Sequence, residues 1–103
     1  MAELDRVIHE PVRLRVMACL DTLEPKDEVD FVYLRDLLEV TDGNLGAHLQ
    51  KLEEAGYISV KKRFVGRKPK TLISATRKGR AAFGEHVEGL RRIIEGGEAG
   101  KGS

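Results

Sequence analysis

The segment 41–61 constrains the fold of this chain more than any other. Thr41 is a typical helix N-cap and Gly56 a typical helix stop, which predicts a helix over 41–55. One face of that helix carries three leucines at helical spacing: Leu45, Leu49 and Leu52. β-Branched and apolar residues follow at once in 57–61 and predict a strand. A half-buried helix that passes directly into a strand needs further elements to cover both.

Two helices are predicted before this segment. Pro11 suits a first helical turn, and apolar residues recur at helical spacing as far as Leu23. The acidic segment 21–30 is predicted to be a loop, and residues 31–33 fit either a strand fragment or the start of the next helix. A short helix is then predicted over 34–40, joined to the following helix by a tight turn.

A hairpin is predicted after the capped helix. Its strands are 57–61 and 71–75, both rich in β-branched and apolar residues. Gly66 and Pro69 interrupt regular structure between them, so we expect a long, basic tip.

The chain closes with one more helix. Thr76 is its predicted cap, and it is expected to run over 76–95, while the glycine-rich residues 96–103 are predicted to form a disordered tail. A length of 103 residues allows a single domain, here 1–95. The fold class expected is mainly α with a small β-hairpin (α+β).

The charges are strongly segregated along the chain. Nine basic residues and no acidic one lie between Tyr57 and Arg80, whereas the whole chain has a formal net charge of +1. The remainder therefore carries −8. If the basic segment occupies one face, the molecule is strongly dipolar. A solvated basic loop is the alternative, but this pattern favours a polyanion-binding surface, with nucleic acid as the leading candidate.

The residues NLGAHLQKLEEAGYI at 44–58 resemble the recognition helix and strand entry of MarR- and ArsR-type regulators, in which the pattern HLxKLExAG leads into the wing. HEPVRL at 9–14 and ATRKGR at 75–80 also resemble that group. The resemblance covers about residues 5–94 and implies a winged helix-turn-helix with N- and C-terminal dimerisation helices. It implies a homodimeric transcriptional regulator of bacteria or archaea that binds a pseudo-palindromic duplex site. Gly46 departs from the pattern, because many relatives carry serine there, so base contacts by this helix are expected to be sparse.

The expected DNA-binding residues lie on two elements. The recognition helix, 41–55, would enter the major groove and the wing, 57–75, would lie on the backbone or minor groove. The helix residues are Thr41, Asn44, Ala47, His48, Gln50 and Lys51. The wing and the turn after it supply Lys62, Arg63, Arg67, Lys68, Lys70 and Arg77.

Several of these residues also have a structural alternative. Asn44 and Gln50 could pair bidentately with adenine, but Asn44 could instead cap the helix start. His48 is a boundary residue that fits either a half-buried position under the wing or a phosphate or base contact. Arg77 and Arg80 would oppose the dipole of the last helix unless they face an anion, although simple exposure would also tolerate them.

The last helix, 76–95, is the predicted dimerisation helix. Its apolar residues have a nearly coiled-coil period and join apolar residues near the N-terminus. The predicted interface comprises Leu4, Val7, Ile8, Phe83, Val87, Leu90 and Ile94. The alternative is a helix that folds back on its own small core.

Other function classes find little support in the sequence. It contains no catalytic constellation, P-loop or dinucleotide motif, so we expect no enzyme and no cofactor. The Cys-x-Cys metal motif of ArsR-type sensors is absent and no metal site is expected; Cys19 fits a small core residue better than a redox thiol. A single cysteine and no apolar run of roughly 20 residues favour a cytoplasmic protein without a membrane partner.

The expected partners are duplex DNA, a second copy of the chain and a small-molecule effector of unknown identity, which would lodge at the dimer interface. Two alternative functions stay open on the sequence alone. One is a winged-helix module that binds protein or RNA, and the other is a sequence-unspecific architectural DNA binder.

Overall fold

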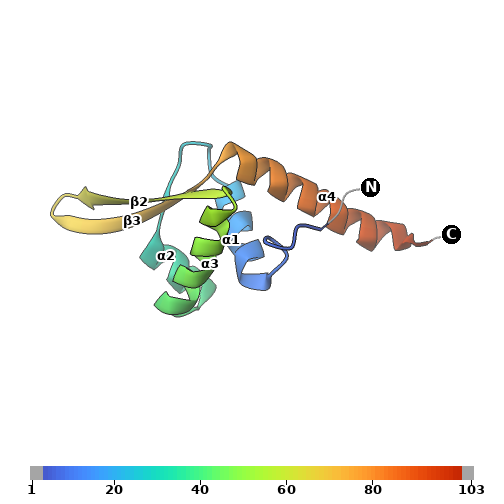
Figure 1. Cartoon of the computed structure of the whole chain (residues 1–103), viewed down its shortest axis with the longest axis horizontal. Coiled ribbons are helices and arrows are strands. Elements are labelled where there is room, and N and C mark those ends of the chain that lie inside the picture. The colour runs from blue at the N-terminus through green and yellow to red at the C-terminus, as the bar shows by residue number, and fades with distance from the viewer. Residues whose placement is uncertain (1–3, 101–103) are drawn as a thin grey trace.

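The computed structural model describes residues 4–100 of the chain. Four helices and a three-stranded antiparallel sheet form one body from which a hairpin and a long helix project in opposite directions (Figure 1). The elements are α1 (Pro11–Asp21), β1 (Val29–Asp30), α2 (Phe31–Leu38), α3 (Asp42–Glu54), β2 (Ile58–Val65), β3 (Lys68–Ala75) and α4 (Arg77–Gly100). The predicted α+β winged helix is confirmed.

Local capping explains where the helices begin. Glu10 caps α1, since its carboxylate accepts from the Arg13 N–H at 2.8 Å, and Pro11 follows in the first turn. The Thr41 hydroxyl accepts from the Asn44 N–H at 3.1 Å and caps α3 as predicted. The Thr76 hydroxyl accepts from a backbone N–H in the first turn of α4 in the same way.

A short strand, β1, lies where the sequence predicted only loop. Val29 and Asp30 pair with Ile73 and Leu72 of β3, so the strand order is β1-β3-β2. The α2 helix begins directly after β1, at Phe31, which settles the ambiguous segment 31–33 as helix.

The wing is more regular than expected. The register runs from Ile58↔Ala75 to Val65↔Lys68, which leaves a two-residue turn, so the prediction of a long tip is wrong. Gly66 has a φ of 67° in that turn, a conformation that costs glycine little. Pro69 is tolerated inside β3 because β1 does not extend that far, and the strand has an open edge there.

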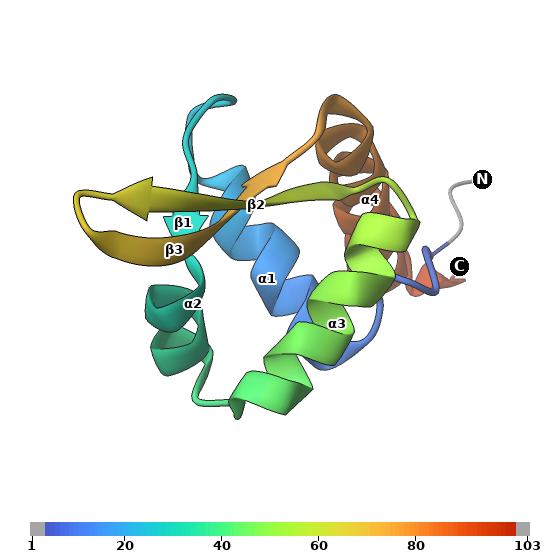
Figure 2. The ribbon, with the colours of Figure 1, turned by 60° about the vertical axis from the view of Figure 1, so that its left-hand side comes forward.

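The core is built around α1, which contacts α2, α3, α4 and β3 (Figure 2). Its buried residues Val16, Met17 and Leu20 meet the leucine face of α3 and Ile73 of β3. The core also includes Ile8 and Phe83, which are 0% and 8% exposed. The prediction that these two residues face a partner chain is therefore wrong, because the chain buries them itself.

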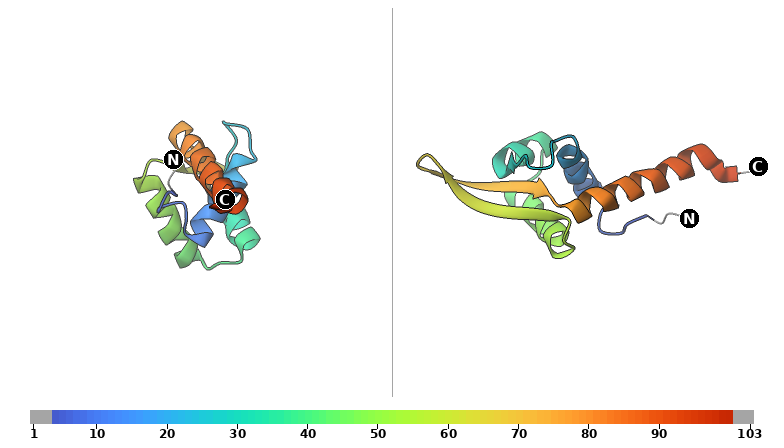
Figure 3. Two further views of the ribbon diagram at one scale, coloured as in Figure 1. Left: turned by 90° about the vertical axis from the view of Figure 1, so that its right-hand side faces the viewer. Right: turned by 90° about the horizontal axis from the view of Figure 1, so that it is seen from above.

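The α4 helix packs on the body only through its first half and then extends beyond it (Figure 3). It reaches Gly100, five residues past the predicted end at 95. Once a helix is nucleated, each further residue adds a backbone hydrogen bond, so residues 96–100 continue the helix instead of forming the predicted tail. Residues 101–103 of that tail lie outside the described part. No helix within 4–100 is both long and apolar enough to cross a membrane.

Candidate nucleic-acid interface

The exposed face of α3 carries most of the predicted major-groove residues. Leu45, Leu49 and Leu52 are buried as expected. The opposite side of the helix is open to solvent and carries Gly43, Asn44, Ala47, Gln50 and Lys51. The predicted division of this helix into a core face and a free face is confirmed.

Thr41 and Asn44 divide the two roles that the sequence left open. The Thr41 hydroxyl acts as the cap, and Asn44 contributes only its backbone N–H to that bond. Within residues 4–100 the exposed Asn44 amide has no hydrogen-bond partner of its own. Its side chain is thus available to a ligand, whereas the Gln50 amide donates to Glu54 at 3.2 Å and must exchange that bond to reach one.

Two glycines leave the backbone of α3 uncovered. A Cβ atom added at Gly43 or Gly46 would meet nothing within 4 Å. Neither glycine is needed for packing, and both leave the helix backbone open at these positions.

An ion pair that the sequence did not indicate joins the two helices of the helix-turn-helix. Arg35 of α2 donates to Asp42 in the first turn of α3 at 2.8 Å and also pairs with Asp36 at 2.9 Å. The hydrogen bond to Asp42, followed by that to Asp36, raises the pKa of Arg35. Asp42 also lies at the positive end of the α3 dipole, so this contact helps to fix the orientation of α3 relative to α2.

His48 packs against the N-terminal turn of α1, not under the wing as one reading of the sequence expected. Its side chain is 16% exposed, and its Nδ1 lies 3.0 Å from Arg13 Nη1 and 3.4 Å from Glu10 Oε1. These contacts engage Nδ1 and tie His48 to the start of α1, so a DNA contact by this residue would have to use Nε2.

The wing divides its cations between two faces. Arg63 and Lys70 are directly opposite each other, and both pair with acids near β1, Arg63 with Glu28 at 2.7 Å and Lys70 with Asp30 at 3.7 Å. The remaining wing cations have no ion-pair partner within residues 4–100: Lys61, Lys62, Arg67 and Lys68. The free positive charge of the wing therefore lies on these four residues, chiefly toward the tip.

The first turn of α4 holds three cations with different surroundings. Arg77 is exposed. Lys78 lies over the Tyr57 ring, with Nζ 5.7 Å from the centroid. Arg80 donates to the carbonyl oxygens of Leu23 at 2.9 Å and Glu24 at 3.2 Å. Its guanidinium group is therefore hydrogen-bonded to the chain segment after α1.

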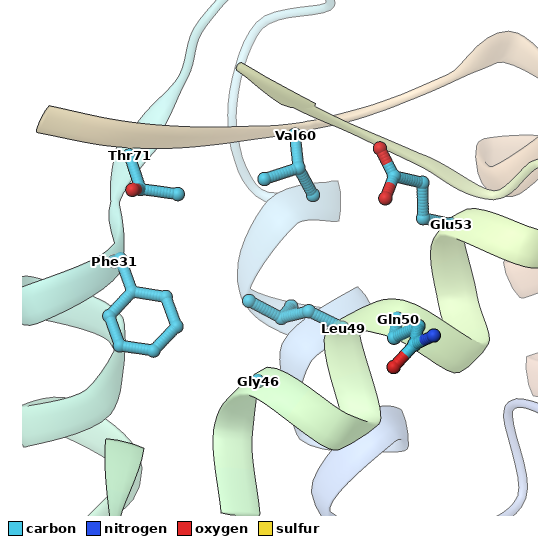
Figure 4. Close-up of a pocket in the computed structure, with 7 residues that line it drawn as sticks. All are labelled: Phe31, Gly46, Leu49, Gln50, Glu53, Val60 and Thr71. Atoms are coloured by element: carbon cyan, nitrogen blue, oxygen red, sulfur yellow. The ribbon is translucent and has the colours of Figure 1, made fainter. Parts of the chain in front are cut away.

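A small groove separates α3 from the base of the wing (Figure 4). Its volume is about 150 Å³, and Phe31, Leu49 and Val60 supply its apolar surface. Gly46, Gln50 and the acidic Glu53 border it on the α3 side, and Thr71 borders it on β3. The free face of α3 and one face of the wing therefore adjoin the same groove.

A polar cluster at the other end of the body ties the N-terminal segment to α4. His86 is fully buried; its Nδ1 accepts from the Asp5 N–H at 3.0 Å, and its Nε2 lies 3.3 Å from Nδ1 of His9. Burial and then His9 lower the pKa of His86, while Asp5 opposes them. The Tyr57 hydroxyl donates to Asp5, and this bond, with burial, raises the pKa of Tyr57 to about 12.

The polar cluster does not have the composition of a metal site. Among residues 4–96, whose side chains the structure describes, no three His, Cys, Asp or Glu side chains come together as metal ligands. Cys19 is half-buried, and burial raises the pKa of its thiol, which disfavours the reactive thiolate.

The fold and this surface define a winged helix-turn-helix protein, with α3 as the recognition helix and β2–β3 as the wing. The chain belongs to the family of winged helix DNA-binding domains, whose family model matches residues 12–94. DNA is therefore its class of partner, and this family and fold are those of transcriptional regulators, which are not enzymes.

Relatives agree with this assignment. A protein of Methanocaldococcus jannaschii is 40% identical over 82 residues, which cover 80% of this chain and 86% of that protein. The structure of a transcriptional regulator homologue from Pyrococcus horikoshii covers 91% of this chain and 90% of its own, with a TM-score of 0.81 at 26% identity. A MarR-family regulator from Enterococcus faecalis covers 89% and 76%, with a TM-score of 0.66 at 20% identity, and shares the fold. The resemblance to winged-helix regulators is confirmed.

Proposed function

We propose that this protein is a homodimeric transcriptional regulator that binds a pseudo-palindromic duplex site. In this proposal α3 enters the major groove while the wing follows the backbone into the adjacent minor groove. The observation that carries the proposal is the groove between Gly46 and Gln50 of α3 and Thr71 of the wing, because it joins an open helix face to an acid-free basic hairpin. A cytoplasmic location belongs to the same proposal.

The two elements would divide affinity and specificity between them. Phosphate contacts by Arg67, Lys68 and Lys62 would supply affinity that depends on salt. Asn44, whose amide is free, would supply base recognition by pairing with adenine. Ala47, beside the open backbone of Gly46, would let the helix sit deep in the groove.

The α4 helix would hold the two copies together. Its outer half exposes a stripe in which Val87 is 42%, Ile93 59% and Ile94 79% exposed. Leu90 of α4 and Leu4 of the N-terminal segment are both half-buried and would add to this interface. An apolar stripe on a helix that has left its own core matches what a second copy would cover, and a twofold dimer presents two wings and two recognition helices to a palindromic site. A small-molecule effector of unknown identity at this interface is a further part of the proposal.

Sedimentation of the whole chain tests the dimer. We expect the wild type and Arg92→Ala, which changes an exposed charge on the same helix, to sediment as dimers. Ile93→Asp with Ile94→Asp should sediment as a folded monomer and bind palindromic DNA more weakly. A monomeric wild type at the concentrations that bind DNA would contradict the dimer.

Selection of bound fragments from the genome of the source organism tests the function as a whole. A regulator should prefer particular fragments over bulk DNA by about a thousandfold or more, and Asn44→Ala should change the preferred sequence. Tight but sequence-blind binding would indicate an architectural protein instead. If the protein binds no duplex but does bind RNA or another protein, it is an interaction module.

A further inference from the structure

The wing tip carries a large aromatic side chain that the chain itself does not cover. Phe64 is 76% exposed, and its neighbour Val65 is 56% exposed. Burying a phenylalanine side chain is strongly favourable, so a chain of this size gives up useful stabilisation by leaving it in water. An exposed aromatic at the end of a projecting hairpin is a feature that binding would explain.

The strand register places Phe64 on a defined face of the wing. Phe64 is directly opposite Pro69, and two residues further along each strand Lys62 is opposite Thr71. Side chains alternate along a strand, so Phe64 shares its face with Val60 and Thr71, which border the groove beside α3. Phe64 and Pro69, the apolar pair at the tip, thus lie on the side of the wing that faces α3.

The charges around this apolar pair point to one kind of occupant. Arg67 in the turn and the flanking Lys68 are exposed and unpaired within residues 4–100, and Lys62 lies on the same face as Phe64. No acidic residue occurs between 57 and 80. A second copy of the chain or an ordinary apolar partner would have to desolvate these cations, whereas a duplex would neutralise them.

The geometry points to Phe64 as an apolar wedge that enters the minor groove between two base pairs and bends the duplex. This inference rests on the proposed placement of the wing in the minor groove. Proteins that bind this groove frequently insert phenylalanine, leucine or proline at a base step and partly unstack it. The two-residue turn through Gly66 holds the tip narrow, and Arg67 beside the wedge would contact the strongly negative floor of the groove.

The test uses the whole chain and an AT-rich duplex that contains a TA step, because such steps unstack most easily. Dyes at the two ends report bending by energy transfer, and 2-aminopurine next to the step reports unstacking by its fluorescence. The variants are Phe64→Ala, Phe64→Leu, which keeps an apolar wedge, and Val65→Ala, which removes an exposed apolar side chain from the other face of the same strand.

We expect the wild type to raise both signals on binding. Phe64→Ala should bind about tenfold more weakly, equivalent to about 1.4 kcal/mol, and should raise neither signal. Phe64→Leu should keep most of both signals, and Val65→Ala should behave as the wild type. Because Phe64 is exposed, Phe64→Ala should keep the wild-type melting temperature, which separates this result from misfolding.

Binding by the wild type without bending or unstacking would overturn the wedge and leave the proposed function intact. Binding to no duplex would instead remove the proposed function and the wedge together. Tighter binding to the single strand than to the duplex, lost in Phe64→Ala, would assign the ring to base stacking and also overturn the wedge. Self-association that Phe64→Ala abolishes, with bending unchanged, would assign it to a contact between copies.

Discussion

Arg63 of the wing donates to Glu28 with 2.7 Å between the two side chains, so an acid in front of β1 holds one of the wing's cations. Lys70, which is opposite Arg63 in the hairpin, forms a second ion pair of this kind with Asp30 of β1 at 3.7 Å. The two contacts dock the hairpin on the body and reduce the free charge of one wing face. The same acids thus reduce the positive charge that the wing leaves unpaired.

Glu28→Gln should release Arg63 without changing the core. We expect duplex affinity to rise and the slope of log K against log salt to steepen by about one unit, since one more cation becomes free to neutralise a phosphate. The free energy of unfolding should change by less than about 1 kcal/mol, because the pair is partly exposed. Glu24→Gln makes the same change in charge on an acid that forms no ion pair with the wing. It is the control, and an equal effect of both variants would show that Arg63 is not specifically restrained.

Gly46→Ala should separate stability from binding. Glycine within a helix costs about 0.5–1 kcal/mol relative to alanine, and a Cβ at Gly46 meets nothing, so the melting temperature should rise. If α3 approaches the bases as closely as its open backbone allows, affinity for the preferred site should fall at the same time. Thermal unfolding and binding titrations measure the two effects, and a variant that is more stable with unchanged affinity would show that close approach is not used.

Gly79→Ala should destabilise the fold severely. A Cβ at Gly79 would lie 2.0 Å from the Tyr57 carbonyl oxygen, and a backbone atom cannot move aside cheaply. We expect a loss of about 3 kcal/mol in the free energy of unfolding by urea, at the upper end of what overpacking costs. Gly84 lies in the same helix with open space around it, so Gly84→Ala should be neutral or stabilising by about 0.5–1 kcal/mol. A similar outcome for both variants would mean that α4 does not pack on the Tyr57 turn as described.

The helix-turn-helix was predictable from the sequence because its signals are local. Thr41 caps a helix through an N–H three residues away, and Gly56, with a φ of 81°, ends the helical segment. The β1 strand was not predictable, because two residues have no periodicity and their pairing partners lie more than forty residues away in β3.

The roles of single residues were harder to predict, because they too depend on contacts between residues that are far apart in the sequence. The apolar pattern of Ile8 and Phe83 is identical whether their own core or a partner buries them, and only the packing of α1 against α4 decides. Likewise the composition of the basic segment does not reveal that Arg63 is paired with Glu28 or that Arg80 binds carbonyl oxygens. The exposure of Phe64 was not predictable, because one aromatic residue among lysines carries no periodic signal.

Stability should fall as the solution is acidified from pH 7. The folded-state pKa of His86 lies below its ordinary value of 6.5, chiefly because of burial, so the unfolded chain takes up a proton that the folded chain resists. The free energy of unfolding should therefore decrease from about pH 6.5 down to the folded pKa. The pKa of Asp5 is also lowered: burial raises it, but the Tyr57 hydrogen bond and two backbone N–H groups outweigh burial. Its contribution is present above pH 3.8 and is lost at lower pH.

His86→Asn tests this assignment. The amide oxygen of asparagine can accept the Asp5 N–H without titrating, so the variant should lose the pH dependence that begins at about pH 6.5, whatever its absolute stability. Urea unfolding at a series of pH values measures the slope. His9→Asn, which removes the neighbouring ring and leaves His86 in place, should keep a pH-dependent slope. An unchanged slope in His86→Asn would assign the titration to another group.

The dependence of DNA affinity on salt, measured for the wild type and for Arg67→Ala with Lys68→Ala, tests the central claim most directly. If the free cations of the wing tip lie on phosphates, the double variant should bind every duplex more weakly and its slope of log K against log salt should be shallower by about one to two units. Arg91→Ala with Arg92→Ala removes the same charge from the far end of α4 and should keep the wild-type slope. Wild-type affinity and slope in the Arg67, Lys68 variant would contradict the wing as a DNA-binding element.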